Sequence, residues 1–198
     1  TGQSLNDVDR LPNGNLIAVG DNGTILTNAG GTSQWILQTS ISQYKIKAVQ
    51  VISQSEVVSL DEIGQVYMST DGGLSWTAAN TIPPDLSPAE DINFKTLLEG
   101  WVIGQGGTAL YRTSDGGNTW IPVPDFGGAY VSVDVEGQNI WANNITGLFY
   151  RSIDNGVSWI QGFLPDSPYL IQDMDFFDTN IGYAVGWGGK AYRSTDGG

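Results

Sequence analysis

An eight-residue phrase recurs along this chain at nearly constant spacing and constrains its fold more than any other feature. Ser-Thr-Asp-Gly-Gly-Leu-Ser-Trp begins at Ser69, related phrases begin at Thr113 and Ser152, and a shorter copy begins at Ser194. The aspartates of the four phrases are 44, 39 and 42 residues apart. Self-similarity at such a period is typical of repeat architectures. We therefore interpret the chain as an array of units of about 40 residues.

The Asp, the second Gly and the Trp of each phrase have predictable local roles. The Asp side chain can accept hydrogen bonds from backbone N–H groups two or three residues further on. The second Gly allows a positive φ, and the Trp restarts a strand and covers the hairpin against its own sheet. These structural residues are Asp71, Gly73, Trp76, Asp115, Gly117, Trp120, Asp154, Gly156, Trp159, Asp196 and Gly198.

Three strand-like segments precede each turn, as residues 91–93, 101–103 and 110–112 show for one unit. Four antiparallel strands in about 42 residues predict a blade of a β-propeller. A β-sandwich lacks this self-similarity, and the coils of a β-solenoid are usually shorter. The fold class is therefore all-β, a single β-propeller domain over 1–198 built from four-stranded antiparallel blades. Five units are visible, at approximately 5–40, 41–81, 82–125, 126–165 and 166–198.

The first and last units depart from the pattern. The first has Trp35 but carries Ala29 where the other turns have Asp, and the last has no Trp strand. Because a closed ring removes exposed sheet edges, either the protein continues beyond residue 198 into a larger ring, or five blades close with the outermost strand missing from the last. We favour the larger ring.

Composition excludes several classes of function. The net charge is −13 with only eight Lys and Arg residues, so we expect no nucleic-acid partner. The absence of Cys and His argues against disulfides, zinc or iron sites and nucleophilic triads, and we expect no metal and no cofactor. No apolar run approaches the roughly 20 residues of a membrane span, so the protein is not expected to be membrane-embedded.

The recurring phrase resembles the Asp-box, also called the bacterial neuraminidase repeat. The longer pattern from Gly104 to Trp120, and again from Gly186 to Gly198, resembles the photosystem II stability/assembly factor family and related exported bacterial propellers. That resemblance implies a non-catalytic scaffold that meets a client membrane protein in an extracytoplasmic (periplasmic, lumenal or secreted) compartment. Sialidases, sortilin-type receptors and xyloglucan-hydrolysing glycosidases carry the same box, so an enzyme stays open as an alternative. Propellers of these families usually have six to eight blades, so the resemblance implies that the five visible units are part of a larger ring of six to eight blades.

The sequence gives little support for a catalytic site. A sialidase needs three arginines around a substrate carboxylate, but the three candidates share one repeat position and would lie on different blades: Arg112, Arg151 and Arg193. The first-strand carboxylates would approach the central axis, where they could line a solvated funnel, hold a hard cation such as Ca²⁺ or supply a glycosidase pair. They are Asp7, Asp9, Asp91, Asp134, Asp173 and Asp175. The solvated funnel is the simpler interpretation, and no catalytic residue is assigned.

The connections between units vary in length and emerge on one face, where repeat scaffolds usually carry binding specificity. Aromatic residues in or next to these loops are the candidate binding residues, although they could equally pack over the blade ends: Tyr44, Phe126, Tyr130, Phe163 and Tyr169. We predict a scaffold that binds a protein or glycan partner through this loop face. The alternatives are a fragment of a glycosidase and a repeat module of a surface adhesin or virion protein.

Overall fold

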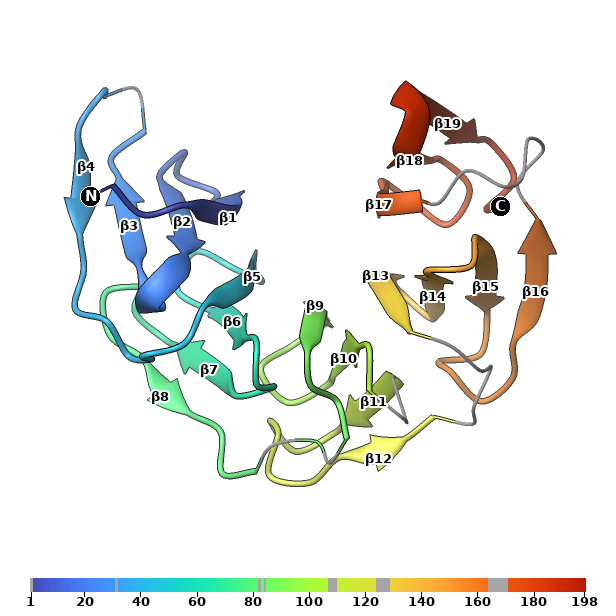
Figure 1. Ribbon diagram of the computed structural model, residues 1–198, viewed down its shortest axis with the longest axis horizontal. Helices are drawn as coiled ribbons and strands as arrows, with labels where there is room; N and C mark the ends of the chain where they lie inside the picture. The colour runs from blue at the N-terminus through green and yellow to red at the C-terminus, as the bar shows by residue number, and fades with distance from the viewer. Residues whose placement is uncertain are drawn as a thin grey trace.

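The computed structural model contains five antiparallel sheets arranged as blades around a central opening (Figure 1). It describes residues 2–30, 32–81, 83, 85–106, 110–123, 129–163 and 171–198. The only helical elements in these ranges are two short 3-10 turns, η1 (Asp21–Gly23) and η2 (Trp187–Gly189). No helix in the described part of the chain is long and apolar enough to cross a bilayer.

Each blade is a consecutive run of strands. Blade 1 consists of β1 (Leu5–Arg10), β2 (Leu16–Gly20), β3 (Ile25–Asn28) and β4 (Trp35–Leu37). Blade 2 consists of β5 (Ile46–Val51), β6 (Val57–Asp61), β7 (Val66–Ser69) and β8 (Thr77–Ala78). Blade 3 consists of β9 (Ala89–Phe94), β10 (Gly100–Gly104), β11 (Leu110–Thr113) and β12 (Ile121–Pro122). Blade 4 consists of β13 (Tyr130–Glu136), β14 (Asn139–Asn144), β15 (Leu148–Ser152) and β16 (Ile160–Phe163). Blade 5 consists of β17 (Ile171–Phe176), β18 (Gly182–Gly186) and β19 (Lys190–Ser194).

The strands of every blade are hydrogen-bonded in chain order, with the first strand nearest the axis (Figure 1). Blades 1 to 4 have four strands each and blade 5 has three within the described residues. The all-β propeller prediction is therefore confirmed. The blades form an arc that is open between blade 1 and blade 5 (Figure 1). The exact unit limits fall in loops, some outside the described residues, and stay a prediction.

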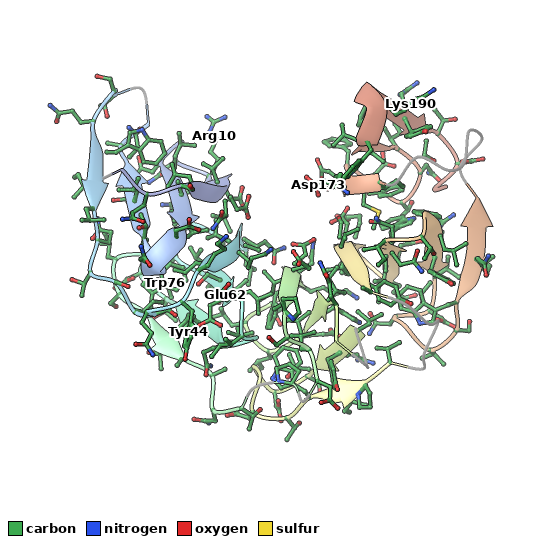
Figure 2. The ribbon with its side chains drawn as sticks, viewed as in Figure 1. Arg10, Tyr44, Glu62, Trp76, Asp173 and Lys190 are labelled. Atoms are coloured by element: carbon green, nitrogen blue, oxygen red, sulfur yellow. The ribbon has the colours of Figure 1, made fainter. Side chains whose placement is uncertain are left out.

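The hydrophobic core lies between blades. Separate clusters of buried side chains join blade 1 to 2, 2 to 3, 3 to 4 and 4 to 5. Trp76, Trp120 and Trp159 pack against the first three of these clusters, and Figure 2 shows Trp76 between blades 1 and 2. Trp76 and Trp159 lie over their own hairpins, as predicted, because the indole nitrogens donate to Gly73 O at 3.1 Å and Gly156 O at 3.2 Å. The same rings also fill space against the preceding blade, which the sequence did not predict. Apolar burial in these clusters stabilises neighbouring blades against each other.

In the Asp-Gly turns the Asp side chain accepts hydrogen bonds from later residues of the same turn, as predicted, and some of these donors lie further along the chain than expected. The Asp71 carboxylate accepts from Leu74 N at 3.0 Å, three residues further on as predicted. It also accepts from Ser75 N at 2.8 Å and Ser75 Oγ at 2.5 Å, one residue beyond the predicted range. Ser69 Oγ accepts from Gly73 N at 2.8 Å. Gly73 has a φ of +87°, as the turn requires. The phrases at Thr113 and Ser152 repeat this pattern.

Candidate functional site at the channel mouth

One face of the arc carries the connections between blades. Residues that enter an inner strand pair with the turn after the second strand of the same blade: Asp21 N donates to Ser4 O at 3.0 Å, and Glu62 N donates to Lys45 O at 2.9 Å. The Asp-Gly turns lie at the opposite end of the strands, because strand direction alternates in every blade. We call the first face the loop face.

Every inner strand contains a one-residue register shift close to its start, on the loop face. Such a β-bulge re-aims the side chain at that point, and bulges are common next to functional sites. The bulge residues, one from each blade, are Asn6, Lys47, Glu90, Val131 and Gln172. The fold therefore presents five different side chains at five equivalent positions.

All five bulge residues line one recess of about 390 Å³, which we call the channel-mouth recess. Its other lining residues are Lys45, Ala48, Asp7, Asp91 and Asp173. Lys47 Nζ lies 2.5 Å from Glu90 Oε2, and Gln105 Nε2 donates to Glu90 Oε1 at 2.7 Å. Asn6 Nδ2 donates to Ile46 O at 2.8 Å. The walls thus combine both charge signs with amide groups, as a polar ligand requires.

The carboxylates below the rim join neighbouring blades. Asp7 Oδ2 accepts from Val49 N of blade 2 at 2.8 Å, and Asp91 Oδ2 accepts from Val133 N of blade 4 at 2.9 Å. Burial raises the pKa of Asp91 to about 7, although its backbone hydrogen bonds act in the opposite direction. We call these contacts carboxylate clamps.

A second row of clamps lies deeper along the inner strands. Asp9 Oδ2 accepts from Val51 N at 2.7 Å, and Asp134 Oδ2 accepts from Phe176 N at 2.6 Å. Burial raises the pKa of Asp134 to about 6. The predicted solvated funnel is wrong for these groups, because their oxygens bind backbone N–H groups of the next blade. Among the described residues there is also no cluster of three or more His, Cys, Asp or Glu that could hold a metal ion.

The three strand arginines lie on the third strands of three different blades, as predicted: Arg112, Arg151 and Arg193. Arg112 Nη2 lies 2.9 Å from Glu99 Oε1, and its guanidinium carbon lies 5.6 Å from the ring centroid of Trp101. The Arg151 guanidinium lies 5.6 Å from the ring of Trp141. Arg112 therefore packs locally against its own blade. Arg151 also reaches the next blade, because its guanidinium donates to Asp196 O at 3.2 Å and to Thr179 O at 3.1 Å in the turns of blade 5.

The structure places the predicted loop aromatics in different environments. Tyr44 is partly exposed on the loop face, at 39%. Tyr130 begins β13 and is buried at 2%, so its assignment to a binding surface is wrong: its ring packs in the core between blades 3 and 4. Phe126 and Tyr169 lie outside the described residues, as does the side chain of Phe163. Binding roles for Tyr44, Phe126, Phe163 and Tyr169 stay predictions.

Sequence reasoning missed the five bulge residues. Their signal was one fixed position near the start of each first strand, directly before Asp in three repeats and before Ala48 or Ser132 in the other two, where each repeat has a different polar or apolar residue. Variation at one fixed scaffold position is what a binding surface built on repeats uses for specificity.

In sequence, the chain is similar to a photosystem II assembly protein. No family model matches the chain. "Photosystem II assembly lipoprotein Ycf48" from Synechococcus sp. (strain CC9902) is 31% identical over 117 residues, which cover 54% of this chain and 34% of that protein. The similarity thus extends over about a third of the relative's length.

Solved structures support the same fold. The structure titled "YCF48 bound to D1 peptide" matches 100% of this chain and 67% of its own, with a TM-score of 0.75 and 19% identity. Virginiamycin B lyase from Staphylococcus aureus matches 98% of this chain and 70% of its own, with a TM-score of 0.74 and 11% identity. At these identities the likeness shows the propeller fold, which assembly factors and enzymes share.

Proposed function

We propose that this protein is a non-catalytic scaffold that binds an extended polypeptide segment of a client protein in the channel-mouth recess. The observation that carries the proposal is the recess itself, where five blades each contribute one bulge residue to a polar pocket of about 390 Å³. Lysine, carboxylate and amide groups together can pair with peptide carbonyls, N–H groups and charged side chains. The inner strands of the arc hold these groups in place.

The comparisons support a protein ligand. A relative in sequence is named as an assembly lipoprotein, and a neighbour in structure is titled as bound to a D1 peptide. By analogy, we propose that this protein assists assembly or stability of its client, and that it acts in an extracytoplasmic compartment. A membrane protein segment exposed on that side would be the natural client.

The carboxylate clamps support a non-catalytic role. A glycosidase needs two carboxyl groups that face a sugar, one of them ready to donate a proton. Here the Asp91 and Asp134 oxygens accept backbone N–H groups across blade junctions, and the chain contains no histidine that could serve as another base. The lyase neighbour shows that enzymes use this fold, so activity screens remain part of the test.

The experiment measures binding of a fluorescent D1 peptide to the purified protein by anisotropy. Lys47→Glu and Glu90→Lys each place like charges across the recess, and we expect either to weaken binding by roughly tenfold, the effect of losing about 1.4 kcal/mol. The double variant restores the ion pair with reversed polarity. It should regain the unfolding temperature of the wild type without regaining peptide affinity.

Leu98→Ser is the matched control, because Leu98 is 62% exposed in the turn between β9 and β10, on the opposite face. Its affinity for the peptide should equal that of the wild type. Peptide affinity that is unchanged in Lys47→Glu and Glu90→Lys, or glycoside turnover that depends on Asp91, would contradict the proposal.

A further inference from the structure

The junction between blades 1 and 2 differs from the next three junctions in the size of the side chains that fill it. In each blade, a residue of the second strand and its partner on the third strand face the blade that follows. These pairs are Val58 and Met68 in blade 2, Trp101 and Arg112 in blade 3, and Trp141 and Arg151 in blade 4. In blade 1 the same positions hold Ile17 and Thr27, so its third-strand residue is the smallest of the four.

The longer third-strand side chains extend to the Asp-Gly turn of the next blade. Arg151 Nη1 donates to Asp196 O at 3.2 Å. Met68 Cε lies 3.7 Å from the position that a Cβ would take on Gly116. Thr27 is several atoms shorter than either residue, so it leaves the corresponding space open.

This space is a pocket of about 330 Å³ on the face of the Asp-Gly turns. Small-molecule sites usually have volumes of about 300–1,000 Å³. The walls come from blade 1 and from the turns of blade 2, at the junction where Figure 2 shows Trp76. Both blades have all four of their strands. The pocket is thus built by one junction within the array.

Three amide side chains of the pocket wall share one arrangement. The side-chain oxygen of each accepts a backbone N–H: Asn13 Oδ1 from Asn15 N at 2.9 Å, Asn15 Oδ1 from Gly30 N at 3.0 Å, and Gln54 Oε1 from Asn13 N at 2.9 Å. Because a backbone N–H can only donate, these contacts fix which amide atom is the oxygen. The three NH₂ groups make no hydrogen bond among the described residues. The wall therefore offers three donor groups that the backbone holds in place.

One acceptor accompanies these donors, and no charge is free. Asn28 is 4% exposed, and its Nδ2 donates to Thr32 O at 3.1 Å and to Gln34 O at 2.7 Å, which leaves its Oδ1 without a partner among the described residues. The Asp71 carboxylate of the wall accepts from donors of its own turn and stays ionised, with a pKa of about 2. The described residues of the wall include no Lys or Arg that could offset an anion. An uncharged ligand therefore fits the pocket best.

The balance of donors and apolar surface identifies the class of ligand. Ile36 of blade 1 and Leu74 of blade 2 line the pocket and are 62% and 64% exposed, so C–H groups of a ligand can pack on them. A sugar hydroxyl has one donor and two acceptor sites, and ring and glycosidic oxygens only accept, which matches a wall with three donor groups and one acceptor. A peptide backbone carries as many N–H groups as carbonyls and would leave this excess of donors unpaired.

We propose that the pocket between blades 1 and 2 is a binding site for a neutral saccharide. The NH₂ groups of Asn13, Asn15 and Gln54 bind sugar oxygens. Asn28 Oδ1 accepts from a sugar hydroxyl. Thr27, at a position where the next three blades carry Met or Arg, opens the site. The pocket lies on the face opposite the channel-mouth recess, and the proposal does not depend on the proposed function.

The test measures the binding of cellotriose, maltotriose and chitotriose to the purified protein by isothermal titration calorimetry. All three are neutral trisaccharides that differ in linkage or substituents. At least one should bind with a dissociation constant in the millimolar range or lower. Trigalacturonic acid, a charged trisaccharide, should not bind, because its carboxylates would meet Asp71 without a cation nearby.

Two variants and a matched control locate the site. Thr27→Met places in the pocket the side chain that blade 2 carries at the equivalent position, so binding should be lost while the unfolding temperature stays at the wild-type value or above. Gln54→Glu keeps the acceptor for Asn13 N and removes the NH₂ group, so binding should weaken by roughly fivefold to tenfold. Gln161→Glu makes the same change on the exposed outer strand of blade 4 and should bind as the wild type does.

Each outcome supports or overturns the proposal. Trisaccharide binding that Thr27→Met abolishes and Lys47→Glu leaves unchanged would support it, since Lys47 lines the channel-mouth recess. Failure of all three neutral trisaccharides to bind at millimolar concentration would overturn it, as would undiminished binding in Thr27→Met. Binding that is lost in Lys47→Glu and kept in Thr27→Met would place the sugar in the recess instead. Loss of D1 peptide binding in Thr27→Met would assign the pocket to a polypeptide and would also contradict the proposal.

Discussion

Asp71 of an outer turn and Asp134 of an inner strand accept similar hydrogen bonds, yet their pKa values are shifted in opposite directions. Asp71, on an outer turn, has its pKa lowered to about 2, first by the hydrogen bond from Ser75 Oγ. Asp134, on an inner strand, accepts from Phe176 N, Val135 N and Asn93 Nδ2, but burial raises its pKa to about 6. The comparison shows that donors alone do not set the acidity of these groups, because loss of water outweighs them near the axis.

The two sets also stabilise different parts of the molecule. The Asp71 contacts stay within one turn, whereas the Asp134 oxygens connect blade 4 to blade 5. Outer aspartates therefore define each hairpin, and inner aspartates hold hairpins of different blades together. Substitutions in the two sets should therefore affect stability differently.

The largest expected effect is the pH dependence of stability. Since Asp91 and Asp134 have folded pKa values of about 7 and about 6, above the 3.8 of an unperturbed Asp, the folded protein keeps protons that the unfolded chain releases. Stability should fall as the pH rises from about 4 to 7. Asp71 and Asp154 have folded pKa values of about 2, below 3.8, so they change stability in the opposite direction. Their contribution to stability is fully present above about pH 4 and is lost as the pH falls towards 2.

Urea unfolding from pH 2 to 9 should therefore give a maximum near pH 4 to 5. Asp91→Asn should flatten the limb above the maximum and leave the acid limb unchanged. A flat profile above pH 5 in the wild type would show that burial does not control the inner carboxylates.

The next largest effect is expected for Asp134→Ala. The substitution leaves the N–H of Phe176 and the amide of Asn93 without their acceptor at the junction of blades 4 and 5. Unpaired partly buried donors should lower the free energy of unfolding by about 2–3 kcal/mol, measured by urea denaturation. Asp134→Asn keeps one carbonyl acceptor and removes a poorly solvated charge, so its loss should be much smaller. Equal losses for the two variants would argue against the clamp.

A smaller effect is expected for Asp71→Ala on the outer turn. Its donors, Leu74 N and Ser75 N, lie at the exposed end of the hairpin, where water can replace the carboxylate. The unfolding temperature should fall by roughly 2–4 °C, and Asp154→Ala should match it because the turn at Ser152 is equivalent. A loss as large as that of Asp134→Ala would remove the distinction between local and inter-blade carboxylates.

The same distinction explains what sequence could predict. The Asp-Gly turns were predictable because their donors and acceptors lie within one phrase, as do the positive φ of Gly73 and its equivalents. The clamps were not, because an alternating strand shows which residues share a face but not which blade faces them. The channel-mouth recess depends on bulges, which arise from strand pairing. Tyr130 was misplaced for a related reason: it is the first residue of the inner strand β13, and its ring enters the core between blades 3 and 4.

The smallest effect should come from removing one hydroxyl at an outer turn. Thr119 Oγ1 donates to Asp115 Oδ2 at 2.7 Å, and this bond is the first cause that lowers the pKa of Asp115. Thr119→Val keeps the shape of the side chain and the backbone bond from Thr119 N at 2.9 Å, so the unfolding temperature should change by less than about 2 °C. The pKa of Asp115, followed by NMR titration, should nevertheless rise towards that of an ordinary aspartate. Ser114→Ala in the same turn is the matched control, since Ser114 makes no contact with that carboxylate among the described residues, and it should leave the titration unchanged. A pKa that stays low in Thr119→Val would mean that backbone donors alone set the acidity of the outer turns, and that the contrast with the inner strands comes only from burial.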